Sequence, residues 1–89
     1  MSKKPFTYAV LKYMTTVDEA SADEVMDALR ADYSSNRQFR KPNVVEILMA
    51  AKENGLLEET RYEFDRNKDI RVYYKAPADG AETINSYIK

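Results

Sequence analysis

A helix, a glycine stop and two alternating segments follow one another directly between residues 41 and 75. Pro42 fits the first turn of a helix, because the N–H group that proline lacks would have no partner there. Apolar residues spaced by three and four positions predict one buried stripe: Val44, Ile47, Leu48 and Ala51. Asn54-Gly55 is a strong end signal, since glycine accepts the left-handed backbone that terminates helices. These residues predict a helix over residues 42–54.

The two segments after Gly55 alternate between apolar and polar residues, which is typical of strands. One predicted face carries Thr60, Tyr62 and Phe64 from the first segment, and Ile70, Val72 and Tyr74 from the second. The residues between them, 65–69, are polar and lack glycine, so we expect a loop longer than a two-residue turn. Residues 57–75 are therefore predicted to form a β-hairpin with a charged tip.

Helix, glycine stop and charged hairpin, in this order, resemble the recognition helix and wing of a winged helix-turn-helix domain. Small prokaryotic winged-helix transcription regulators are the closest general resemblance, which covers the whole chain and rests on its architecture. It implies an α+β fold with a three-helix core, a hairpin wing and a C-terminal helix. It also implies binding to double-stranded DNA, with the helix in the major groove and the wing beside the backbone or minor groove. Such regulators usually act as homodimers.

The other segments complete one predicted domain over residues 1–89, beginning with a flexible basic tail over residues 1–4. A first helix is expected over residues 5–16, and a short strand near Val17 or Ala20 could pair with the hairpin. Ser21 and Glu24 have the spacing of a capping box, which predicts a second helix running to about Tyr33. Phe39 is expected to anchor the segment before the third helix. A second capping box at Asp79 would open a terminal helix over residues 79–89.

The composition limits what chemistry the chain can perform. It contains no cysteine and no histidine, which excludes disulfides, thiol nucleophiles and zinc or haem sites built from those ligands. It has only two glycines and no phosphate-binding glycine-rich motif. We therefore expect no enzyme activity, no metal and no cofactor. No apolar run reaches membrane-spanning length, and the N-terminus lacks a signal peptide's apolar core, so a soluble cytoplasmic protein without membrane contact is expected.

Basic residues near the predicted helix and wing are the candidates for DNA contact. The candidate phosphate contacts are Arg37, Arg40, Lys41, Arg66 and Lys68, joined by Lys3 and Lys4 if the tail reaches DNA. Asn43 could pair its amide with adenine. Asn43 could equally be the N-cap of the third helix.

The outward face of the third helix favours an alternative function. This face is expected to hold Asn43, Val45, Glu46, Met49, Ala50 and Glu53. Glutamates repel phosphates, and an apolar centre suits a protein partner. The alternative is a protein-interaction or dimerisation module that does not bind DNA, using Val45 and Met49, or Ile84, Tyr87 and Ile88 of the terminal helix. A formal net charge of −1 also argues against a dominant non-specific nucleic-acid binder. A positive strip over the third helix and wing would favour DNA, and a neutral apolar patch would favour protein.

Overall fold

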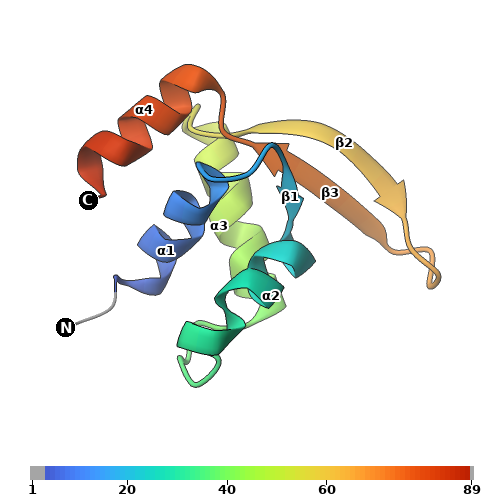
Figure 1. The fold of residues 1–89 in the computed structure, drawn as a ribbon. Coiled ribbons are helices and arrows are strands. Elements are labelled where there is room, and N and C mark those ends of the chain that lie inside the picture. The colour runs from blue at the N-terminus through green and yellow to red at the C-terminus, as the bar shows by residue number, and fades with distance from the viewer. Residues whose placement is uncertain (1–3, 89) are drawn as a thin grey trace.

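The computed structural model describes residues 4–88, which form a mixed α+β globule of four helices and one three-stranded antiparallel sheet (Figure 1). Its elements in chain order are α1 (Phe6–Met14), β1 (Ala20–Ser21), α2 (Ala22–Tyr33), α3 (Lys41–Glu53), β2 (Glu58–Phe64), β3 (Ile70–Lys75) and α4 (Ala78–Tyr87). The predicted α+β class is confirmed. Among these residues, no helix combines the length and apolar character needed to cross a membrane.

The core lies where α1, α2 and α3 meet beneath the base of the sheet. Its largest fully buried side chains include Phe6, Val10 and Met14 of α1, Val25 of α2, and Val44 and Leu48 of α3. Each belongs to an apolar stripe that the sequence predicts. Phe39 is half-buried, and its ring meets Phe6 edge-on with centroids 6.0 Å apart, so its predicted anchoring role is confirmed.

The sheet has the strand order β1-β3-β2. The predicted short strand is confirmed, because Ala20 pairs with Tyr74 and Ser21 with Tyr73. Ser21 is also the N-cap of α2, and the predicted capping box is confirmed. Its hydroxyl accepts the Glu24 N–H at 3.4 Å, and the Glu24 carboxylate accepts the Ser21 N–H at 2.9 Å. This box fixes the exit from β1 directly into α2.

A β-bulge interrupts the alternation predicted for β2. Glu59 opposes Tyr74 and Arg61 opposes Tyr73, so Thr60 is an extra, unpaired residue. The expectation that Thr60 shares a face with Tyr62 is therefore wrong. Beyond the bulge, the predicted faces of the hairpin are confirmed, since Tyr62 opposes Val72 and Phe64 opposes Ile70.

Three predicted helix ends differ from the structure. α1 stops at Met14, where the hydroxyl groups of the two following threonines donate to the carbonyl groups of Lys12 and Tyr13. α3 begins one residue before Pro42 with Arg40 at the N-cap position, so the N-cap assignment of Asn43 is wrong. α4 begins at Ala78 after Pro77, so the capping box predicted at Asp79 is also wrong. Proline's fixed backbone sets the start there, and no side chain caps the helix.

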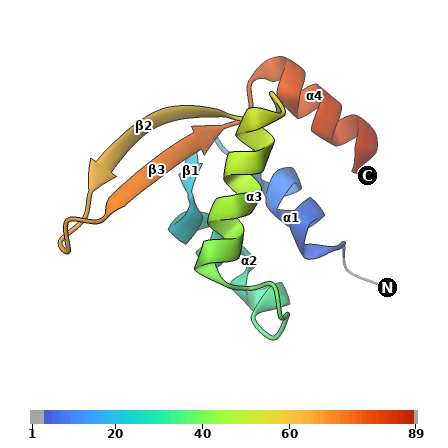
Figure 2. The ribbon, with the colours of Figure 1, turned by 180° about the vertical axis from the view of Figure 1, so that it is seen from behind.

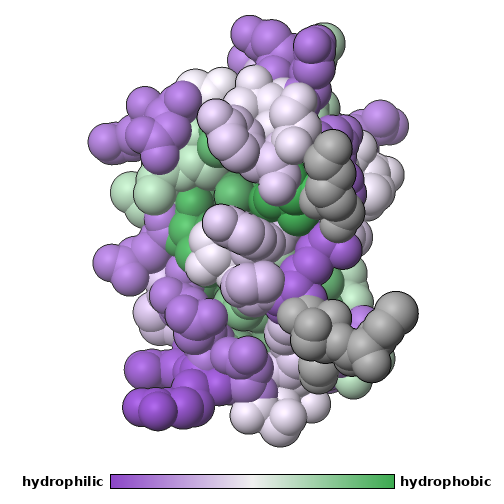
Figure 3. Space-filling view, turned by 90° about the vertical axis from the view of Figure 1, so that its left-hand side faces the viewer, coloured by the Kyte–Doolittle hydropathy of each residue, from purple (hydrophilic) through white to green (hydrophobic). Residues whose placement is uncertain are grey.

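α4 packs against α1 of the same chain. Ile84 and Ile88 are 2% and 5% exposed and belong to the hydrophobic core. The Lys12 ammonium donates to the Ile88 carbonyl oxygen at 2.9 Å. Figure 3 views the side of the molecule on which α1 and the end of α4 lie, where hydrophobic surface is framed by hydrophilic side chains. The helix therefore completes this chain's own core.

Candidate nucleic-acid interface

α3 occupies the front of the molecule in Figure 2, with the loop over residues 34–40 beneath it and the hairpin extending to one side. The outward side of α3 carries Glu46, Ala50 and Glu53, all exposed, and the partly exposed Asn43. The predicted DNA contacts lie on these three segments.

The loop before α3 presents Arg37 and Arg40 to solvent. A hydrogen bond inside the loop stabilises its conformation, because the Asn36 carboxamide oxygen accepts the Gln38 N–H at 2.8 Å. Asn43 donates to the Gln38 carbonyl oxygen at 2.9 Å, which ties the loop to the first turn of α3. Both arginines, together with Asn43, line a shallow hollow of about 280 Å³. The loop therefore brings two predicted phosphate contacts and the predicted base contact together.

The hairpin tip presents the second pair of predicted contacts, Arg66 and Lys68. The Asp65 carboxylate accepts the N–H groups of Asn67 and Asp69 at 2.8 and 3.0 Å. Lys68 has a φ of 63°, in the left-handed region that a tight loop requires. The Asp65 carboxylate thus organises the tip from inside, and both cationic side chains remain exposed.

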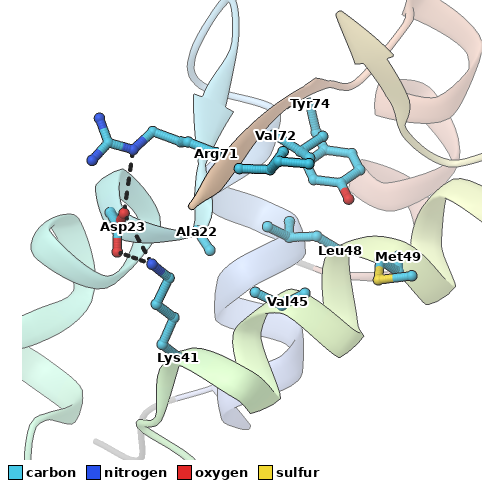
Figure 4. Close-up of a pocket in the computed structure, with 10 residues that line it drawn as sticks. Ala22, Asp23, Lys41, Val45, Leu48, Met49, Arg71, Val72 and Tyr74 are labelled. Carbon is cyan, nitrogen blue, oxygen red and sulfur yellow. Dashed lines mark hydrogen bonds and ion pairs between the residues drawn. The ribbon is translucent and has the colours of Figure 1, made fainter. Parts of the chain in front are cut away.

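Lys41 differs from the other predicted phosphate contacts, because it already has a carboxylate partner. Its ammonium lies 3.1 Å from one oxygen of Asp23, and the Arg71 Nε lies 3.4 Å from the other (Figure 4). That Nε atom is buried and makes no hydrogen bond. Asp23 therefore joins the starts of α2 and α3 to β3, and Lys41 is held in this cluster.

Within residues 4–88, the basic residues from Arg30 to Lys75 fall into two groups, those with a carboxylate partner and those without one. The cations with a carboxylate within ion-pair distance are Arg30, Lys41, Lys52, Arg61, Arg71 and Lys75. By contrast, Arg37, Arg40, Arg66 and Lys68 make no ion pair and no side-chain hydrogen bond in this part of the chain. We call these four residues the free cations. They are four of the five phosphate contacts predicted in the helix, loop and wing.

The predicted contribution of the tail is only partly visible. Lys3 lies outside the described residues. The Lys4 backbone carbonyl accepts the Tyr33 hydroxyl at 2.6 Å, which holds this residue against α2.

One face of the hairpin carries Arg61, Glu63 and Tyr73, and an ionic network that the sequence did not indicate holds this face in place. Arg61 Nε donates to Glu19 at 2.8 Å, and its NH1 donates to Glu63 at 3.0 Å. The Arg61 guanidinium also stacks 3.8 Å from the centre of the Tyr73 ring, whose hydroxyl donates to Glu63 at 2.7 Å. Hydrogen bonds from Thr60 and then Arg61 lower the pKa of Glu19, and the bond from Tyr73 lowers the pKa of Glu63. The network joins the hairpin to the connector before β1.

The opposite face of the hairpin is apolar and looks toward α3. Large exposed hydrophobic side chains gather there, with exposed fractions of 50% for Met49, 64% for Tyr62, 64% for Phe64 and 59% for Ile70. Between α3 and β3 lies a hollow of about 120 Å³, lined in part by Val45, Met49 and Val72 (Figure 4). Val45 and Met49, both predicted interaction residues, therefore lie together at this cleft.

The interaction residues predicted in α4 separate from one another. Tyr87 is 83% exposed, whereas Ile84 and Ile88 are buried against α1. Only Tyr87 of these three is accessible to a partner in this structure.

No protein-family model matches the chain, and no curated protein matches its sequence. Within residues 4–88, no cluster of three or more acidic side chains is suited to holding a metal ion.

Proposed function

We propose that the chain is a winged helix-turn-helix domain that binds double-stranded DNA and regulates transcription. In this proposal α3 is the recognition helix and the β2–β3 hairpin is the wing. The observation that carries it is the placement of the free cations. Arg37 and Arg40 lie at the start of α3, and Arg66 and Lys68 lie at the wing tip. A duplex lying across α3 would meet both pairs.

Free cations suit phosphate binding, because no internal ion pair has to break before they bind. Their contribution depends on counterion release and should weaken steeply as salt increases. Phosphate contacts position a protein on DNA, while contacts with base edges provide sequence specificity. Asn43 is the polar side chain of α3 best suited to a base edge, and Ala50 can contact a thymine methyl group. Glu46 and Glu53 on the same side disfavour close approach to phosphates, so we expect modest specificity.

The test is fluorescence-anisotropy titration of a labelled duplex over a salt series. Arg66→Gln/Lys68→Gln and Arg37→Gln/Arg40→Gln should each weaken binding and flatten the salt slope by about 1–2 units, because each lost phosphate contact removes about 0.9. The matched control is Arg30→Gln/Lys75→Gln, which removes the same charge from cations paired with Asp27 and Glu58. An equal loss of DNA affinity in all three variants would show that binding depends only on net charge, which would contradict the proposed site.

The second candidate is a protein-interaction or homodimerisation module, favoured by the exposed Met49, Tyr62, Phe64 and Ile70. It predicts no binding to any duplex at low salt. It also predicts a concentration-dependent sedimentation coefficient that Met49→Ser abolishes. Duplex binding by a monomer would exclude it.

A further inference from the structure

We infer that the hairpin stacks Tyr62 and Phe64 on unpaired nucleobases, so that DNA with a single-stranded segment beside a duplex is the favoured ligand. This inference rests on the proposed DNA-binding function and specifies the substrate of the same surface. It begins from the two aromatic side chains, which have no structural task in the core.

Tyr62 and Phe64 are two residues apart on β2 and project from the same face. Each is 64% exposed, and neither belongs to the hydrophobic core or packs against it. Their rings touch only edge-on, with centroids 6.1 Å apart and planes at 88°. In such a T-shaped contact the edge of one ring meets one face of the other, so the pair covers one ring face and leaves the other ring faces free of this contact. Aromatic side chains presented in this way can stack on bases, and every base offers a flat face for such contact.

The charged groups around the rings leave two cations available for phosphate. Glu59, on the same face, is paired with Lys52 at 3.3 Å. Glu63 points to the opposite face, where Arg61 and Tyr73 hold it. The tip carries two cations, Arg66 and Lys68, and two carboxylates, Asp65 and Asp69, so its formal charges cancel. The Asp65 carboxylate is turned onto backbone N–H groups of the loop, whereas Arg66 and Lys68 are exposed and unpaired and can bind phosphate.

A groove at the tip brings one of the two rings, Phe64, and one of the two free cations, Arg66, into a single lining. It is an open groove of about 460 Å³, lined by Phe64, Asp65, Arg66, Asn67 and Arg71. This lies within the range of about 300–1,000 Å³ common for small-ligand pockets, which is large enough for one nucleotide. A base against the Phe64 ring would place its phosphate near Arg66. The Asn67 carboxamide could bond to the base edge.

Paired bases cannot occupy this site, because they are already stacked on their neighbours inside the duplex. Bases at a fork or a melted segment are free to turn outward. A second copy of the chain is the rival occupant of the aromatic face. Lysine and acidic residues are depleted at the centres of protein interfaces, whereas the tip beside Phe64 carries Lys68, Asp65 and Asp69. The surroundings therefore favour a nucleotide.

The test compares a labelled duplex with the same duplex carrying unpaired arms, by anisotropy at one salt concentration. The full chain should bind the fork about tenfold more tightly, since stacking contributes roughly 1–3 kcal/mol per base. Tyr62→Ala/Phe64→Ala should remove this preference and keep the duplex affinity. Tyr62→Leu/Phe64→Leu should remove it equally, because leucine keeps the apolar surface but not the flat ring. The control is Tyr8→Ala/Tyr87→Ala, which truncates exposed aromatic residues elsewhere.

Each other outcome overturns the inference in a recognisable way. Equal affinity for duplex and fork would refute stacking while leaving the proposed DNA-binding function intact. No binding to either probe at low salt would remove both. A leucine variant that retains the fork preference would show that apolar contact alone suffices. A fork preference unaffected by alanine, together with a smaller sedimentation coefficient, would assign the aromatic face to an interface between copies.

Discussion

Arg61 donates a 2.8 Å hydrogen bond from its Nε to Glu19, which lies in the connector immediately before β1. The other oxygen of Glu19 accepts the Thr60 hydroxyl at 2.7 Å. Thr60 is the bulge residue of β2, so Glu19 holds the hairpin at the point where its strand is irregular. Bulges increase the local twist of a strand. We conclude that this contact sets the direction in which the hairpin leaves the base of the sheet.

The first prediction concerns acid stability. The folded-state pKa values of Glu19 and Glu63 are lowered from their ordinary 4.5 by hydrogen bonds to the ionised carboxylates. The stability that these groups contribute is therefore complete above pH 4.5 and is lost as the pH falls through the lowered folded values. Glu19→Gln should lower Tm at neutral pH, and the difference from the unmodified chain should narrow in strong acid.

Thermal unfolding followed by circular dichroism across a pH series checks this behaviour. Glu82→Gln is the control, because Glu82 is an exposed carboxylate of α4 with no ion pair among the described residues. A Glu19→Gln deficit that persists unchanged in acid would show that the loss comes from packing and not from the charge.

The second prediction concerns the start of α4. Gly80 is buried, and a Cβ added there would collide with the backbone carbonyl of Leu56. Backbone cannot rotate away as a flexible side chain can, so Gly80→Ala should cost about 1–3 kcal/mol of unfolding free energy, as overpacking usually does. Urea denaturation measures the change, and Ser86→Ala on the exposed side of α4 is the control. An unchanged urea midpoint would mean that α4 is not seated against Leu56.

The third prediction separates α4 as a core element from α4 as a dimer element. Ile84→Ala should lower the unfolding free energy by about 2–5 kcal/mol, the range for truncating a buried aliphatic side chain. Tyr87→Ala, on the exposed side of the helix, should change it by less than about 0.5 kcal/mol. Neither substitution should alter the sedimentation coefficient. A smaller particle for Tyr87→Ala would instead indicate that the exposed side of α4 joins two copies.

The sequence predicted the parts of this fold that depend on neighbouring residues. The Ser21–Glu24 capping box, the apolar stripe of α3 and the hairpin around Asp65 each require residues at most a few positions apart. Local hydrogen bonds and alternating burial determine these features, and a pattern along the chain records both. The start of α4 was misplaced although its signal is local, because Pro77 and Asp79 both favour a helix start and the proline prevailed.

The missed features depend on residues that only the fold brings together. Nothing in the spacing of Asp23 and Lys41 indicates an ion pair, since two helices and the loop between them must pack first. The Thr60 bulge was hidden because alternation around it looks continuous, and it is defined only by the partner strand. The candidate DNA contacts could therefore be predicted from the sequence as a set of residues. Only the structure shows that Lys41 is ion-paired with Asp23 and that the free cations have no such partner.

The last prediction uses that difference. Asp23→Asn removes the carboxylate shared by Lys41 and Arg71 while keeping the shape of the side chain. Lys41 stands at the first position of α3, directly after Arg40, so its release should add one phosphate contact. Duplex DNA should then bind more tightly, with a salt slope steeper by about 0.9. Loss of an acid from the first turn of α2 should also lower stability by about 0.3–1 kcal/mol.

Asp27→Asn provides the matched comparison, because it frees Arg30 on α2 and changes the net charge equally. Anisotropy titrations over a salt series on both variants, with circular dichroism to check folding, distinguish a local contact from a global charge effect. A larger gain in affinity and slope for Asp23→Asn would place Lys41 at the DNA. Equal gains would show that only net charge had changed, and a loss of affinity with intact folding would mean that the Asp23 cluster positions α3 for binding.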